Sequence, residues 1–132
     1  MLVLITRQKE KSKEFASMLN NKNIKNISFP VLDIETLMPT DANLSDLNKS
    51  NFLIFTSQNS VIAFMDLFSK ADLTGKKVAS IGIATKSALE KFQINVDISP
   101  KEDFTSEKLL EEITKFKLKN ELIVIIKGKE GR

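Results

Sequence analysis

Four residue types are missing from this sequence of 132 residues: cysteine, histidine, tyrosine and tryptophan. Without cysteine there are no disulfides, thiolate nucleophiles or thiolate metal sites. Without histidine the chain lacks the commonest metal ligand, the usual general base near neutral pH and any Ser–His–Asp triad. We therefore expect no metal site, and any chemistry rests on hydroxyls, carboxylates, amides, lysines, arginines and the backbone.

The sequence also lacks a long apolar run and a clear excess of one charge. The first apolar run, residues 2–5, is far too short for a signal-peptide core or a membrane span, and no other run approaches that length. The 20 basic and 17 acidic residues are well mixed, without the clustered basic face that nucleic-acid binding needs. We expect a cytoplasmic protein that binds neither nucleic acid nor membranes.

What is present is a regular alternation of short apolar runs and segments of helical periodicity. The apolar fraction of 42% and the charged fraction of 28% are typical of a folded globular protein. The runs predict strands over residues 2–6, 26–29, 51–55, 77–81, 94–98 and 121–127. The periodicity predicts helices over residues 8–20, 59–69, 84–92 and 105–117, and at most one helical turn over 44–47.

A proline-bounded connector, Pro30–Pro39, is the domain boundary that this pattern favours. It separates a βαβ portion, residues 1–33, from a larger portion, residues 34–132. Right-handed crossovers between the strands make this a doubly wound α/β fold with parallel sheets. We expect the first strand to be buried. The helical stripes place these residues in the core: Phe15, Met18, Leu19, Val61, Phe64, Met65, Phe68, Ala88, Leu89, Phe92, Leu109, Leu110, Ile113 and Phe116.

Three of the predicted strands end in polar or glycine-containing turns, residues 55–61, 81–85 and 127–132. The carboxyl ends of parallel strands lie along one edge of a sheet, and ligands bind in the crevice there. The sequence therefore predicts that the three turns face one cleft.

Each turn allows a structural and a functional interpretation. A hydroxyl or amide among residues 56–59 caps the following helix, and the same helix start also offers N–H groups to a carboxylate or phosphate. The same alternatives apply to Thr85, while Gly82 permits a tight turn or close approach of a ligand. Lys129 and Arg132 are either solvated loop charges or attract an anionic ligand, and Arg7 sits at another strand end.

Six segments together resemble the uroporphyrinogen-III synthase family. They are residues 3–7, Pro30, 55–61, 81–85, 104–110 and 128–132, which match the family pattern in order and spacing. The resemblance covers the whole chain but only about the first half of the family's usual length. It implies a uroporphyrinogen-III synthase-like fold with an incomplete first domain, a βαβ stub, and a second domain that lacks its last helix.

The resemblance implies a cofactor-free hydro-lyase of tetrapyrrole and haem biosynthesis. The family takes linear hydroxymethylbilane, expels water, inverts the last pyrrole ring and closes the macrocycle to uroporphyrinogen III. A site that folds this substrate into one reactive conformation needs no strong acid or base. By position, the implied substrate-binding residues are Thr56, Ser57, Gln58, Asn59, Gly82, Ala84, Thr85, Arg7 and Lys129.

Several alternatives stay open for a chain of this length. It is either a truncated active synthase, or a catalytically inactive fragment or dimerising tetrapyrrole-binding remnant. A βαβ stub is too small to be stable alone, which favours a homodimer that pairs or exchanges the stubs. A generic doubly wound signalling domain is disfavoured, because its acidic pocket needs an aspartate where this chain has Thr6 and Arg7.

Overall fold

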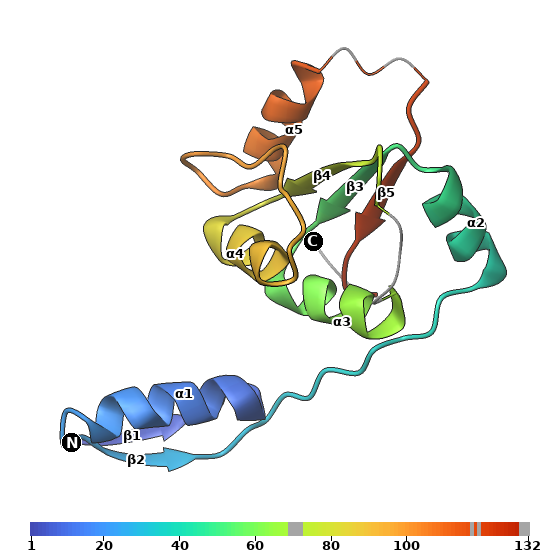
Figure 1. Cartoon of the computed structure of the whole chain (residues 1–132). Coiled ribbons are helices and arrows are strands. Elements are labelled where there is room, and N and C mark those ends of the chain that lie inside the picture. The colour runs from blue at the N-terminus through green and yellow to red at the C-terminus, as the bar shows by residue number, and fades with distance from the viewer. Residues whose placement is uncertain (69–72, 117, 119, 130–132) are drawn as a thin grey trace. The chain divides into compact units, whose positions relative to one another are not determined.

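The chain forms two compact units, each with its own parallel sheet (Figure 1). This computed structural model describes residues 1–68, 73–116, 118 and 120–129. Unit 1 is Met1–Thr36 and unit 2 is Leu37–Arg132. The predicted α/β class with parallel sheets is confirmed.

Unit 1 is a single helix packed on a two-stranded sheet. Strands β1 (Leu2–Ile5) and β2 (Lys25–Ser28) pair in parallel, and α1 (Lys9–Asn20) connects them. The apolar side chains buried in unit 1, all of whose residues are described, are Ile5 and Leu19. Unit 1 therefore has a very small core.

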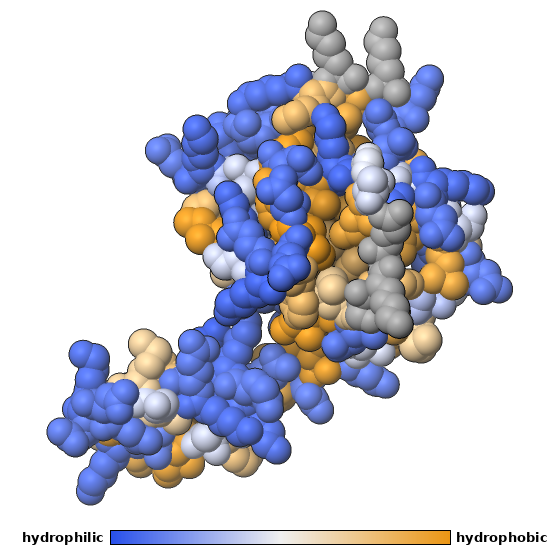
Figure 2. Space-filling model, viewed as in Figure 1, coloured by the Kyte–Doolittle hydropathy of each residue, from blue (hydrophilic) through white to orange (hydrophobic). Residues whose placement is uncertain are grey.

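The prediction that the first strand is buried holds for Ile5 and is wrong for Leu2 and Leu4. Leu2 is 61% exposed and Leu4 is 59% exposed, because within fully described unit 1 the sheet carries a helix on one face and no element on the other. Met18 and Phe15 of α1 are exposed as well, contrary to the helical stripe. Apolar surface is accordingly visible on unit 1 in Figure 2.

Unit 2 is a three-layer arrangement around a parallel sheet in the order β4-β3-β5. The central strand alternates its side chains between two cores. Phe52 and Ile54 pack with Leu109 and Ile113 of α5, whereas the other two side chains of β3 pack against α3 and α4. The elements are α2 (Asp41–Lys49), β3 (Phe52–Phe55), α3 (Gln58–Phe68), β4 (Lys77–Ser80), α4 (Ile83–Lys91), α5 (Ser106–Thr114) and β5 (Ile123–Ile126).

Two local predictions for unit 2 are wrong, each because of a polar side chain. α2 is a full helix rather than one turn, since Thr40 and Asn43 form a reciprocal capping box at its start. Residues 94–98 contribute a single bridge, Ile98 to Ala79, rather than a strand. There the carboxylate of Asp97 accepts the hydrogen bond of the Val78 N–H at 2.8 Å, in the place of a strand partner.

Three residues that the helical stripes place in the core are exposed in unit 2. They are Phe92 of the α4 C-terminus, Leu110 of α5 and Phe116 just beyond α5. Leu110 is 61% exposed although its neighbour Leu109 is buried. The apolar stripe of α5 is thus wider than the sheet surface that it covers.

Lys76, directly before β4, forms hydrogen bonds with the end of α2. Its Nζ donates to the carbonyl oxygens of Leu47 at 3.1 Å, Asn48 at 3.2 Å and Ser50 at 2.5 Å. The last carbonyls of a helix have no partner within the helix and carry partial negative charge, so a cation stabilises them. This contact joins two elements that are far apart in the sequence.

We expect Lys76→Met to lower the free energy of unfolding by about 1–3 kcal/mol, because several carbonyls lose a charged donor. Urea denaturation followed by far-UV circular dichroism measures the change. Lys91→Met is the control, since Lys91 is an exposed lysine at the end of α4. Equal destabilisation by both variants would show that the Lys76 contacts contribute nothing specific.

Candidate functional site

The carboxyl ends of the three strands of unit 2 lie side by side. The register places Phe55 of β3 opposite both Ser80 of β4 and Ile126 of β5. Just beyond β3, Thr56 donates to the Ile126 carbonyl oxygen from its N–H at 3.3 Å and from its hydroxyl at 3.2 Å. The turns after β3, β4 and β5 therefore leave the same edge of one sheet.

At the end of β3, Ser57 caps α3 in a reciprocal arrangement with Ser60. The Ser60 N–H donates to the Ser57 hydroxyl and the Ser57 N–H donates to the Ser60 hydroxyl, both at 3.1 Å. Ser60 is buried, whereas Ser57 is partly exposed at the sheet edge. Gln58 and Asn59 form the first turn of α3 and are also partly exposed. The capping interpretation of Ser57 is thus observed directly, and the residue is still partly exposed.

At the end of β4, Gly82 precedes α4 as its N-cap residue. Gly82 has an extended backbone and supplies no side-chain cap, so the first N–H groups of α4 have no side-chain acceptor at this position. Ala84 is exposed in the first turn, but Thr85 is buried at 5% exposure. The N–H of Thr85 therefore suits the predicted role better than its hydroxyl does.

The predicted basic residues differ in their positions in the chain. Lys129 follows β5 and is exposed. Arg7 follows β1 in unit 1, so its part in a site on unit 2 stays a prediction. Arg132 lies outside the described residues.

Phe104 is a residue of this edge that the search for polar turns missed. Its Cβ and Cγ lie 3.5 and 3.7 Å from the point that a side-chain Cβ on Gly82 would occupy. One feature of the sequence could have indicated it. Phe104 is an aromatic residue directly before Thr105, the N-cap of α5, and therefore lies in the loop that leads to the helix rather than in the helix itself. A Cβ at position 82 would be in ordinary van der Waals contact with Phe104, so the two residues are close neighbours at this edge.

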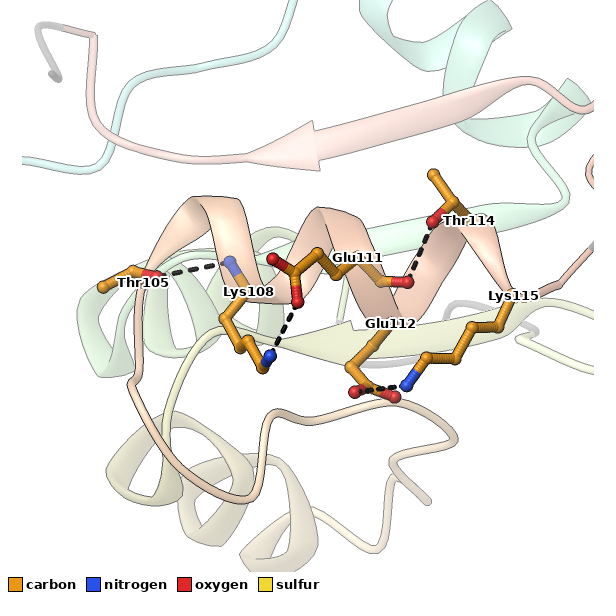
Figure 3. A network of polar contacts seen from close by, with 6 residues as sticks. All are labelled: Thr105, Lys108, Glu111, Glu112, Thr114 and Lys115. Carbon is orange, nitrogen blue, oxygen red and sulfur yellow. Dashed lines mark hydrogen bonds and ion pairs between the residues drawn. The ribbon is translucent and has the colours of Figure 1, made fainter.

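The ion pairs with the clearest electrostatic effect lie elsewhere, on the surface of α5 (Figure 3). A hydrogen bond to Glu111 raises the pKa of Lys108, and a hydrogen bond to Lys115 lowers the pKa of Glu112. Both pairs are exposed and span one helical turn, at 2.6 and 2.7 Å. Such pairs support a helix rather than catalysis.

A cavity of about 460 Å³ lies at the opposite edge of the sheet. It is lined by apolar residues from the ends of α3 and α4 and by the polar residues Thr74, Lys76, Gln93, Asn95 and Asp97. Lys76 and Asp97 are already engaged, by the carbonyls at the end of α2 and by the Val78 N–H. The predicted binding residues do not line this cavity.

Within the described part of the chain there is no group of three acidic side chains that could hold a metal ion. Across the same residues, no helix has the length and apolar character needed to cross a bilayer.

The fold and this edge define an α/β protein whose strand ends and helix starts form the candidate binding surface. Residues 13–132 match the family model of uroporphyrinogen-III synthase HemD. The chain therefore belongs to the uroporphyrinogen-III synthase family, whose characteristic activity is that of a hydro-lyase.

Two relatives are similar to this chain in sequence, and one solved structure is similar to it in fold. A Methanocaldococcus jannaschii protein named "Putative uroporphyrinogen-III synthase" is 35% identical over 129 residues, which cover 95% of this chain and 52% of that protein. The uroporphyrinogen-III synthase of Chlorobaculum parvum is 27% identical over 132 residues, with 96% and 52% covered. The chain thus spans about half the length of these relatives.

The crystal structure of uroporphyrinogen III synthase from the extremely thermophilic bacterium Thermus thermophilus superposes with a TM-score of 0.56 at 14% identity. The match covers all of this chain and 53% of the other. At this identity the likeness concerns the fold.

Proposed function

We propose that this chain acts in the synthesis of uroporphyrinogen III and binds hydroxymethylbilane at the carboxyl edge of β3, β4 and β5. Membership of the family supports the reaction, and the alignment of the three strand ends supports the location. In this proposal residues 1–33 correspond to part of the family's first domain and residues 34–132 to its second.

The substrate carries many carboxylates, which suits the groups gathered at this edge. Ser57, Gln58 and Asn59 supply a hydroxyl and amides at the start of α3. Thr56 lies directly before them, with its N–H and hydroxyl donated to the Ile126 carbonyl oxygen. Gly82, Ala84 and Thr85 supply N–H groups from the start of α4. Helix starts favour anions because the first N–H groups have no partner within the helix itself and the helix dipole is positive there. Lys129, which follows β5, adds attraction for an anionic ligand.

The chemistry that such a surface supports is positional catalysis. The reaction requires loss of water from the linear tetrapyrrole, inversion of its last pyrrole ring and closure of the macrocycle. Fixing the carboxylates at several points holds the linear tetrapyrrole in one conformation. We propose that this conformation favours closure of the macrocycle with the last pyrrole ring inverted over closure without inversion. The chain itself needs no cofactor for this role.

A second candidate is tetrapyrrole binding without turnover. The observation that favours it is the apolar surface of unit 1, where Leu2, Leu4 and Ile27 are exposed. In this alternative the chain dimerises through unit 1 and binds the tetrapyrrole without converting it.

We expect the 132-residue chain to shift the product of hydroxymethylbilane towards isomer III. Freshly generated hydroxymethylbilane is supplied, the products are oxidised, and the uroporphyrin isomers are separated chromatographically. Isomer III above the level without protein supports the synthase. Isomer I alone, with measurable tetrapyrrole binding, supports the second candidate, and absence of both contradicts the proposal.

Ser57→Ala and Ser60→Ala form a matched pair for the same assay. Ser57→Ala removes the acceptor of the Ser60 N–H. Ser60→Ala removes the acceptor of the Ser57 N–H and also the hydroxyl that donates to the Ser57 carbonyl oxygen at 2.7 Å. We expect each to cost about 1–2 kcal/mol of stability. Only Ser57 is accessible at the edge. We expect Ser57→Ala to lower isomer III formation or tetrapyrrole affinity by about 10-fold beyond Ser60→Ala, the effect of one lost hydrogen bond to a charged group. Equal effects would assign Ser57 a capping role alone.

A further inference from the structure

Phe104 is a large apolar side chain held at the edge where the substrate is proposed to bind. After Ile98 pairs with Ala79, the chain crosses the carboxyl end of the sheet and reaches α5. On this crossing Phe104 lies beside Gly82, the N-cap residue of α4, with its Cβ 3.5 Å from the point that a Cβ on Gly82 would occupy. The ring nevertheless stays 44% exposed.

The backbone on both sides of Phe104 is fixed. Asp103 has a left-handed conformation, with φ of 50°. The N–H of Thr105 donates to the Asp103 carbonyl oxygen at 2.6 Å, and the Thr105 hydroxyl accepts from the Lys108 N–H at 3.2 Å. These hydrogen bonds hold the backbone next to Phe104, so less of the backbone needs to be ordered when a ligand binds there.

We propose that Phe104 is a substrate-positioning residue whose exposed ring surface packs against a pyrrole ring of the linear tetrapyrrole. This inference rests on the proposed function, because it places the ligand at the same edge. Helix starts and hydroxyls recognise carboxylates but leave the pyrrole rings without a partner. Aromatic rings pack face to edge or offset, and such a contact fixes both the position and the tilt of the bound ring.

Phe92 provides a matched control for Phe104. It is also a phenylalanine with 44% exposure, but it lies at the C-terminal end of α4 and lines the cavity of the opposite edge. Substitution of either residue by leucine removes an aromatic ring of the same accessibility. Only Phe104 lies at the proposed binding edge.

The test is titration of wild type, Phe104→Leu, Phe104→Trp and Phe92→Leu with uroporphyrin III, followed by the change in porphyrin absorbance. We expect Phe104→Leu to weaken binding by about 3- to 10-fold, with Phe104→Trp close to wild type. We also expect Phe92→Leu to have no effect on binding and all urea midpoints to stay similar. Equal binding by Phe104→Leu and Phe92→Leu would overturn the role of Phe104 and leave the proposed function standing. Failure of the wild type to bind uroporphyrin III, together with no isomer III in the assay above, would overturn both.

Discussion

Phe55→Ala is expected to lower the free energy of unfolding of unit 2 by about 3–5 kcal/mol. Phe55 ends the central strand β3 and has no exposed surface. Its ring meets that of Phe64 edge to face, with the centroids 5.3 Å apart. Alanine would leave a cavity between β3 and α3 that neighbouring residues cannot fill, because both faces of the sheet are already packed.

The same substitution is expected to disturb the candidate site. Thr56 follows Phe55 directly, and the N–H of Ile81 donates to the Phe55 carbonyl oxygen at 3.3 Å. Displacing this residue therefore shifts the starts of two turns that carry predicted binding residues. We expect tetrapyrrole affinity to fall together with stability.

Urea unfolding, followed by circular dichroism, measures the effect of Phe55→Ala. Phe92→Ala is the control, because Phe92 is a partly exposed phenylalanine outside the two buried clusters. We expect it to cost about 1 kcal/mol or less. Similar losses for the two variants would contradict the view that β3 is the centre of the core.

The parts of the fold predicted most accurately are those in which burial and periodicity agree. Residues 52–55 are apolar without alternation because both faces of β3 are covered, which is the pattern expected inside a parallel sheet. The helix after β3 follows from its apolar stripe and from Ser57 at its start. The common edge of the three turns follows from parallel pairing alone.

The errors arise where a contact distant in sequence decides the outcome. An apolar run such as residues 2–5 predicts burial, but burial also needs a partner layer that unit 1 does not contain. The Asp97 carboxylate replaces a strand partner of β4, which no periodicity indicates. Phe104 reaches Gly82 across more than twenty positions of sequence, so its place at the edge is visible only in three dimensions.

The amide hydrogens of β1 and β2 are expected to exchange at least about 100-fold faster than those of β3 in dilute solution. Local opening free energies follow the apolar contacts that opening breaks, and a 100-fold difference corresponds to about 3 kcal/mol. Unit 1 buries Ile5 and Leu19 as its apolar residues, whereas every residue of β3 is buried. An isolated two-stranded sheet is marginally stable at best in water.

Hydrogen exchange measured by mass spectrometry over a range of protein concentrations tests this contrast. Equal protection of β1 and β3 in dilute solution would contradict it.

The proposed homodimer adds a further expectation, because a second copy that covers Leu2, Leu4 and Ile27 slows exchange in unit 1 as the concentration rises. Leu4→Asp is expected to abolish that concentration dependence. Ile62→Asp, at an exposed position of α3 in unit 2, serves as its control and is expected to preserve it. A dependence unaffected by Leu4→Asp would place the dimer contact outside the sheet of unit 1.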